Sequence, residues 1–194
     1  MRASPLCLTF WRLLLAASVL LGLPAHGQSN PKNVVTTERT RAELLAHAPE
    51  GLEAGKPVWV GLQLAHQPEW HSYWKNSGDS GLPTRLEWTL PPGVVAGEIA
   101  WPMPRKYPIG TLINYGYADT VMLPVPLTIT PDFKPPLFKD ALEVKLKAQW
   151  LVCRKECIPE EGEFVLHVPV KSTTALHAAA FQSSFAAQPQ QLKG

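Results

Sequence analysis

Cysteine is scarce in this chain of 194 residues. There are three, Cys7, Cys153 and Cys157, and no second pair or cluster of histidines accompanies them. Cys153 and Cys157 are separated by three residues, so a disulfide between them would close a loop close to the minimum length. The stabilisation that a disulfide gives grows with the length of the loop it closes. Most of the stability must therefore come from a hydrophobic core.

The chain also lacks a surplus of charge. It has 18 Lys and Arg against 16 Asp and Glu, and two of the basic residues, Arg2 and Arg12, lie in the first 27 residues. Without these two, 16 basic and 16 acidic residues give a net charge of zero. A nucleic-acid-binding protein would need a basic patch, so we expect no nucleic-acid partner.

Long apolar runs are missing except near the N-terminus. There, Arg2 and Arg12 are followed by an apolar run from Leu13 to Leu23 and by the pattern Ala25-His26-Gly27, with small residues on both sides of His26. This layout predicts a signal peptide over residues 1–27, with a short flexible segment over 28–33. The run is shorter than the roughly 20 residues that a membrane-spanning helix needs. We expect the chain to be exported, with a retained signal anchor as the alternative; Cys7 is too far from the cleavage point to be a lipid anchor.

Proline and glycine are abundant, with 20 and 13 residues, and they punctuate short runs of alternating character. This is typical of a sandwich or barrel. Five runs are predicted as strands: 56–66, 84–90, 120–129, 141–152 and 163–170. Residues 36–47 are ambiguous between strand and helix. We expect one all-β sandwich over residues 34–170, followed by a helical or disordered linker tail over 171–194.

Two prolines and a long connection add detail. Pro124 and Pro126 lie within the predicted strand 120–129, which favours a place at a sheet edge or a bulge because proline lacks an N–H. Residues 101–119 are rich in Pro, Gly and Tyr and are predicted as a long ordered loop. Loops of this length are commonly functional.

The segment "WLVCRKECIPEEGEF" holds the cysteine pair. Residues four apart can meet on one helix face or across a three-residue loop between strands. Ala148, Trp150 and Val152 continue the alternation of the preceding strand, which decides for the second arrangement. We therefore predict Cys153 at the end of one strand, Cys157 at the start of the next, and residues 154–156 in the turn.

Three roles for the pair remain open. It could be a structural disulfide, as is common in exported proteins. It could be a redox-active dithiol, in which Arg154 and Lys155 favour the attacking thiolate and nearby glutamates oppose it. It could also belong to a zinc or Cu(I) site, for which His66, His71 and His167 are candidates, although the spacing does not favour one. The "GDSG" at residues 78–81 matches a serine-protease motif, but no positioned triad accompanies it.

Three segments taken in order carry a family resemblance: "WHSYWKNSGDSGLPTRLEW", "WPMPRKYPIGTLINYGYAD" and "WLVCRKECIPEE". Together they resemble the N-terminal periplasmic domain of the DsbD family of thiol:disulfide interchange proteins, in its ScsB-like branch. The resemblance implies an immunoglobulin-like β-sandwich with Cys153 and Cys157 as the redox pair and Cys157 as the sulfur that forms mixed disulfides. It also implies a cap that shields the pair, with Tyr115 and Tyr117 as candidate shields and Tyr73 near the cysteines. Asn114 stands where the family has an aromatic ring.

The resemblance implies a function as well. The domain would act as a component of a protein-disulfide reductase without a cofactor, taking electrons from a thioredoxin-like periplasmic domain and passing them to disulfide-bearing acceptors. Membrane contact would come only through a missing or separate partner domain, so the chain would be a stand-alone version or part of a longer protein. The alternative is a secreted binding module that docks a redox or copper-handling partner and keeps a structural disulfide.

Overall fold

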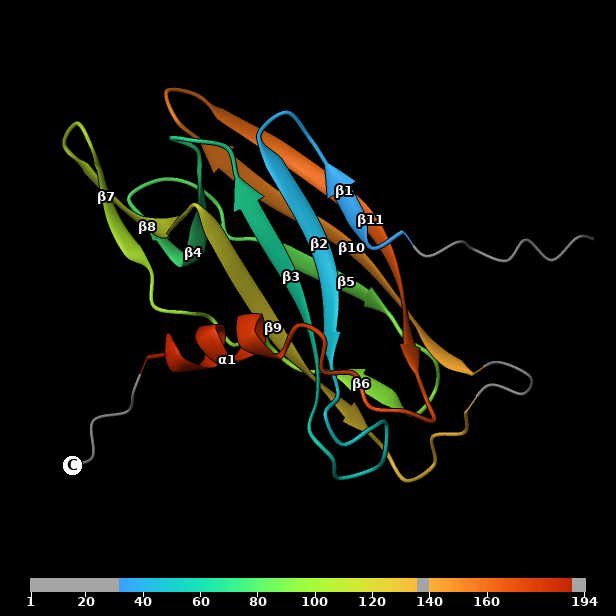
Figure 1. Cartoon of the computed structure of the whole chain (residues 1–194). Helices are drawn as coiled ribbons and strands as arrows, with labels where there is room; N and C mark the ends of the chain where they lie inside the picture. The colour runs from blue at the N-terminus through green and yellow to red at the C-terminus, as the bar shows by residue number, and fades with distance from the viewer. Residues whose placement is uncertain (1–31, 136–139, 190–194) are drawn as a thin grey trace, which may run out of the picture.

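The computed structural model describes residues 32–135 and 140–189, which form two β-sheets and one short helix (Figure 1). The predicted signal peptide and most of residues 28–33 lie outside the described residues. The first sheet has the order β1-β2-β3-β9-β6, made of β1 (Val34–Thr36), β2 (Thr40–His47), β3 (Val58–His66), β9 (Thr120–Ile129) and β6 (Val94–Ala96). Residues 36–47, which were ambiguous, thus contain a strand.

The second sheet has the order β11-β10-β4-β8-β7. Its strands are β11 (Cys157–Pro169), β10 (Ala141–Cys153), β4 (His71–Gly78), β8 (Leu112–Ala118) and β7 (Arg105–Ile109), and β5 (Arg85–Thr89) also pairs with β10. All the pairings within the two sheets are antiparallel. The predicted two-layer sandwich is confirmed.

The core lies between the two sheets, and β10 shows how the sequence builds it. Leu142, Val144, Leu146, Ala148, Trp150 and Val152 are all buried in one core cluster, while the residues between them are largely exposed. Successive side chains of a strand point to opposite faces. The alternation seen in the sequence therefore places one face of β10 against the first sheet.

Two details of the prediction were wrong. The strand with Pro124 and Pro126 lies inside the first sheet, between β3 and β6. It is tolerated there because the carbonyls of both prolines point to the β6 side, where they accept from Ala100 N (2.7 Å) and Gly97 N (2.9 Å). The nitrogen of a strand residue points to the same side as its own carbonyl, so no ladder bond to β3 is lost.

The other error concerns residues 101–119, which are not a loop. They contain the β7–β8 hairpin, with Ile109 paired with Leu112 and Tyr107 paired with Asn114. Gly110 makes the turn with φ of 62°, a value that glycine adopts readily. The Pro and Tyr content hid the strand pattern. This hairpin completes the second sheet beside β4.

The C-terminal segment adds a helix, α1 (Ala178–Ala186), on the outer face of the first sheet (Figure 1). Phe181 is fully buried there against Leu45 and Met122. Gly61 makes room for it, since a Cβ at that position would lie 3.2 Å from the Phe181 ring. Ser184 Oγ donates to the Met122 carbonyl at 3.0 Å. In the described part of the chain, no helix is long and apolar enough to cross a membrane.

Candidate functional site: the cysteine hairpin

Cys153 and Cys157 lie at the end of the long β10–β11 hairpin (Figure 1). They are paired directly across the two strands and form a disulfide with a Cα–Cα distance of 4.1 Å. The turn is closed by a hydrogen bond from Arg154 N to Glu156 O of 3.1 Å. The predicted strand–turn–strand placement of the two cysteines is confirmed.

The two sulfurs differ in their surroundings. Cys153 is buried, with 1% of its surface exposed, because β10 has β11 on one side and β4, through His71, on the other. Cys157 is exposed, because β11 is the outer strand of the sheet. An incoming sulfur can therefore reach Cys157 much more easily than Cys153.

Tyr73 is brought to the pair by β4. His71 is paired with Cys153, and Tyr73, two residues further along, lies on the same face of the sheet. Its hydroxyl lies 3.8 Å from Cys157 Sγ. A disulfide sulfur carries no hydrogen, so the hydroxyl is the donor. Burial raises the pKa of Tyr73 above its ordinary value, which keeps the hydroxyl protonated.

Two further rings complete the inner side of the site. His71 stacks on Tyr107, with ring centroids 4.7 Å apart and planes 5° apart, and meets Tyr73 edge-on at 5.3 Å. Burial lowers the pKa of His71 below 6.5, so the imidazole is neutral at pH 7. Sequence reasoning missed the place of Tyr107 here, because it depends on the unrecognised β7–β8 hairpin.

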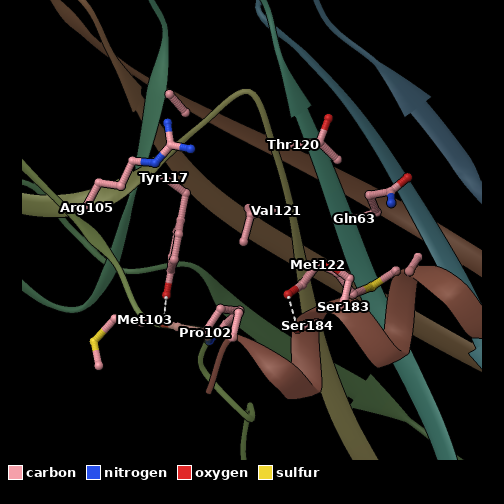
Figure 2. Close-up of a pocket in the computed structure, with 13 residues that line it drawn as sticks. Gln63, Pro102, Met103, Arg105, Tyr117, Thr120, Val121, Met122, Ser183 and Ser184 are labelled. Carbon is pink, nitrogen blue, oxygen red and sulfur yellow. Dashed lines mark hydrogen bonds between the residues drawn. The ribbon is translucent and has the colours of Figure 1, made fainter. Parts of the chain in front are cut away.

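Tyr115 and Tyr117 are placed elsewhere. Tyr117 is paired with Ser72, so the register puts it on the opposite face from His71 and Tyr73, and Tyr115 shares that face. The Tyr117 hydroxyl donates to the Pro102 carbonyl at 2.8 Å (Figure 2), and burial raises its pKa strongly. The Tyr115 ring packs edge-on against Trp74. We therefore revise the predicted shield: of the three tyrosines, the structure brings only Tyr73 to the sulfurs.

Tyr117 instead helps to line a cavity of about 510 Å³ beside α1 (Figure 2). Gln63, Arg105, Met122 and Ser184 are among the other residues that line it. This cavity is thus formed by the core-facing side of β8 together with β9 and the helix. It does not include the cysteine pair.

The three histidines considered for a metal site do not converge. His167 lies on β11 ten residues beyond Cys157, which corresponds to about 33 Å along a strand. The Nδ1–H of His66 donates to the Asp119 carbonyl at 3.0 Å. Within residues 32–135 and 140–189, no group of three or more His, Cys, Asp or Glu residues could hold a metal ion. The predicted candidates therefore do not form one ligand set.

Arg154, the basic residue that follows the buried Cys153, contacts two residues of a neighbouring turn. Arg154 Nη1 lies 3.5 Å from Glu69 Oε2, and its guanidinium lies 5.2 Å from the centre of the Trp70 ring. A second guanidinium, that of Arg39, lies 5.1 Å from the same ring. Arg154 thus ties the cysteine turn to the turn between β3 and β4.

The comparisons agree with this geometry. Residues 41–169 match the family described as "Thiol:disulfide interchange protein DsbD, N-terminal". The chain belongs to this family. The match spans both cysteines and the strands from β2, apart from its first residue, to β11, so the paired strands and the cysteine hairpin of this chain are parts of a DsbD N-terminal domain with an immunoglobulin-like fold.

Two solved structures are similar to this DsbD-family chain. One is the N-terminal periplasmic domain of ScsB from Proteus mirabilis, with 17% identity and a TM-score of 0.61; the match covers 83% of this chain and 60% of that one. The other is the reduced DsbD N-terminal domain of Neisseria meningitidis, with 13% identity, a TM-score of 0.39, and coverage of 65% of this chain and 83% of that one. The chain thus spans less than two thirds of the ScsB domain. No curated protein matches it.

Proposed function

We propose that this DsbD-family domain exchanges disulfides with partner proteins in the periplasm through Cys157. The observation that carries the proposal is the difference between the two sulfurs of one hairpin: Cys157 is exposed and Cys153 is 1% exposed. A disulfide that serves only to pin a turn needs no such asymmetry. An exchange reaction does, because a mixed disulfide must form at one sulfur and be resolved by the other.

The steps follow from this arrangement. In the reduced domain, the Cys157 thiolate attacks one sulfur of the acceptor disulfide, and the electron pair of the broken bond leaves on the second acceptor sulfur. Cys153 then loses its proton to water, and its thiolate attacks Cys157 Sγ. This forms the Cys153–Cys157 bond and releases the acceptor's remaining sulfur as a thiolate. The acceptor is reduced by two electrons and the domain is oxidised by two.

The electrons would be replaced by the reverse route. A thiolate of a thioredoxin-like periplasmic domain attacks the exposed Cys157 Sγ, and the electron pair of the disulfide goes to Cys153. The family to which the chain belongs supports this partner class. Export by the signal peptide over residues 1–27 is part of the same proposal, because disulfide exchange requires both proteins in one compartment.

The test is a trapping experiment. Cys153→Ser leaves Cys157 without its resolving partner, so a mixed disulfide with a thioredoxin-like domain should accumulate on a non-reducing gel; Cys157→Ser is the matched control and should trap nothing. The midpoint potential is measured in parallel. A potential below about −300 mV, as in structural disulfides, with no trapped complex from either variant would refute the proposal and favour a binding module instead.

A further inference from the structure

The loop that follows β4 carries the "GDSG" sequence of residues 78–81. In the structure it folds back over β8. Asp79 N donates to the Ile113 carbonyl at 3.0 Å, and Ile113 N donates to Asp79 Oδ2 at 2.7 Å. Gly78 begins the turn with φ of 87°, and a Cβ there would lie 2.2 Å from the Ile113 oxygen. The loop is therefore fixed to the neighbouring strand at close range.

Asn114 provides the second attachment. Its side chain is fully buried, and Oδ1 accepts from both Ser80 N (3.0 Å) and Ser80 Oγ (3.1 Å). Its Nδ2 is buried without a hydrogen-bond partner among the described residues. An unpaired buried donor costs free energy. The buried position of Asn114 is thus better explained by its two hydrogen bonds to Ser80 of the loop than by a contribution to the stability of the core.

Loop 77–81 packs against the ring of Tyr73. Gly81 has φ of 91°, and a Cβ at that position would lie 2.3 to 2.5 Å from three atoms of the Tyr73 ring. Within the loop, Ser77 Oγ donates a hydrogen bond to the Gly81 carbonyl at 3.0 Å. His71 borders the same ring edge-on. Tyr73 is consequently confined between Gly81 and His71, with 1% of its surface exposed.

We propose that loop 77–81 is a clasp that holds the Tyr73 hydroxyl on Cys157 and thereby sets the reactivity of that sulfur. The proposal rests on the function proposed above, because it concerns the same sulfur. Gly81, Ser80 and Asn114 act as positioning residues: they contact Tyr73 or the loop and reach the sulfur only through the Tyr73 hydroxyl.

The chemical consequence appears on reduction. When a donor dithiol delivers two electrons, the S–S bond breaks and Cys157 becomes a thiol or a thiolate. The hydroxyl that donates to the disulfide sulfur can donate to the thiolate, and a hydrogen bond to a charged group is stronger than one to a neutral group. The clasp therefore increases the thiolate fraction of Cys157 at neutral pH. It does so only while Tyr73 is held in place.

The test compares two glycines that both have a positive φ, of 91° at Gly81 and 80° at Gly55. Gly81→Ala places a methyl group against the Tyr73 ring. Gly55→Ala is the matched control, because Gly55 has φ of 80° and a Cβ there would meet nothing within 4 Å. Both are made in the Cys153→Ser chain, alone and combined with Tyr73→Phe. The probe is iodoacetamide, and mass spectrometry follows the peptide that contains Cys157 as a function of pH.

The expected result concerns the midpoint of the pH profile, which reports the thiolate fraction. Tyr73→Phe and Gly81→Ala should each move the midpoint to higher pH, giving roughly three- to tenfold slower alkylation at pH 7 for an unchanged plateau. Gly55→Ala should leave the midpoint unchanged. In the Tyr73→Phe chain, Gly81→Ala should add no further shift. Differences in the high-pH plateau report access to the sulfur and are read separately.

Two outcomes overturn the proposal: an unmoved midpoint in Gly81→Ala, or an equal shift with and without the Tyr73 hydroxyl. The other titratable groups around the pair are the same in every variant: His71 of β4, Tyr107 of β7, Glu69 beside Arg154, and Arg154, Lys155 and Glu156 of the turn. If Gly81→Ala does not fold, Ser80→Ala removes one of the two bonds to Asn114 and should shift the midpoint in the same direction by less; no shift overturns the proposal.

The result is independent of any partner protein, because iodoacetamide reacts with the sulfur directly. A shifted alkylation midpoint in a domain that traps no partner and has the low potential of a structural disulfide would support the clasp and refute the exchange function. Trapping of a partner together with an unchanged alkylation midpoint would support the exchange function and refute the clasp.

Discussion

The two faces of the second sheet are built on different principles. The face toward the first sheet is a continuous apolar surface that includes Leu146, Trp150 and Phe164. The outer face, near the hairpin end, holds a disulfide, a neutral histidine, two tyrosines and a buried asparagine. The first face obtains its stability from burial, and the second holds polar groups in fixed positions through contacts between distant segments. Stability and reactivity are therefore separable in this domain by substitutions on opposite faces.

The largest expected effect is on the core face. Phe164→Ala should lower the free energy of unfolding by about 3–5 kcal/mol, because Phe164 is 1% exposed and its removal leaves a cavity. The measurement is urea unfolding of the oxidised protein. The alkylation midpoint of Cys157 in the folded state should not change. A loss below about 1 kcal/mol would mean that this face is not the main source of stability.

A pair of tyrosines on opposite faces sharpens the contrast. Tyr117→Phe leaves the Pro102 carbonyl without its donor and should cost about 1–2 kcal/mol of stability, with no effect on the alkylation midpoint. Tyr73→Phe should shift the midpoint and cost less, because the hydroxyl's partner is a sulfur, a weak acceptor. Unfolding and alkylation measured on both variants test this. If Tyr117→Phe moved the midpoint, the separation of the faces would be wrong.

The same division explains what could be predicted from the sequence. The alternation in β10 is visible in the sequence and, with the short spacing of the two cysteines, predicted the strand–turn–strand placement of Cys153 and Cys157; the strand predicted over 163–170 begins six residues earlier in the structure, where β11 starts at Cys157. Local patterns carry this information because successive strand residues face opposite sides. The sequence could not show which tyrosine lies near the sulfurs, because Tyr115 and Tyr117 are excluded only by the pairing register of β8 with β4. A shift of one residue in that register would place Tyr115 and Tyr117 on the same face as the disulfide.

Other parts of the site depend on still longer-range contacts. Tyr107 reaches His71 only through the β7–β8 hairpin, which looked like a loop because of its Pro and Gly. Asn114 holds Ser80, 34 residues away, and no local signal marks that bond. The available clue was the pair of glycines in "GDSG", Gly78 and Gly81, which both have a positive φ in the structure. The sequence does not show that the turn they form contacts β8 and the Tyr73 ring.

A smaller effect is expected from pH. Burial lowers the pKa of His71 below its value in the unfolded chain, so as the pH falls the unfolded chain takes up the proton first. Stability is complete above about pH 6.5, the ordinary pKa of histidine, and is lost as the pH falls toward the lower folded-state pKa. Melting temperatures between pH 7.5 and 5 measure this loss.

His71→Phe is the comparison for the pH effect, because it retains a ring for Tyr107 and cannot be protonated. It should flatten the slope without removing it, since burial also lowers the pKa of His47 and His66. If the melting temperature depended on pH equally in the variant and the parent, the pKa of His71 would be the same in the folded domain as in the unfolded chain, which would contradict the prediction.

The smallest effect is expected at the turn itself. Arg154→Gln removes the ion pair to Glu69 and the contact with Trp70, but the side chain is 44% exposed and the pair is screened by solvent. The loss should be about 0.5 kcal/mol or less. Arg85→Gln, at an exposed arginine of β5, controls for the loss of one positive charge. Because Arg154 fastens the turn while the clasp holds Tyr73, Arg154→Gln should leave the Cys157 midpoint closer to the parent value than Gly81→Ala does. A larger shift from Arg154→Gln would transfer control of the sulfur from the outer face of the sheet to the charges of its own turn.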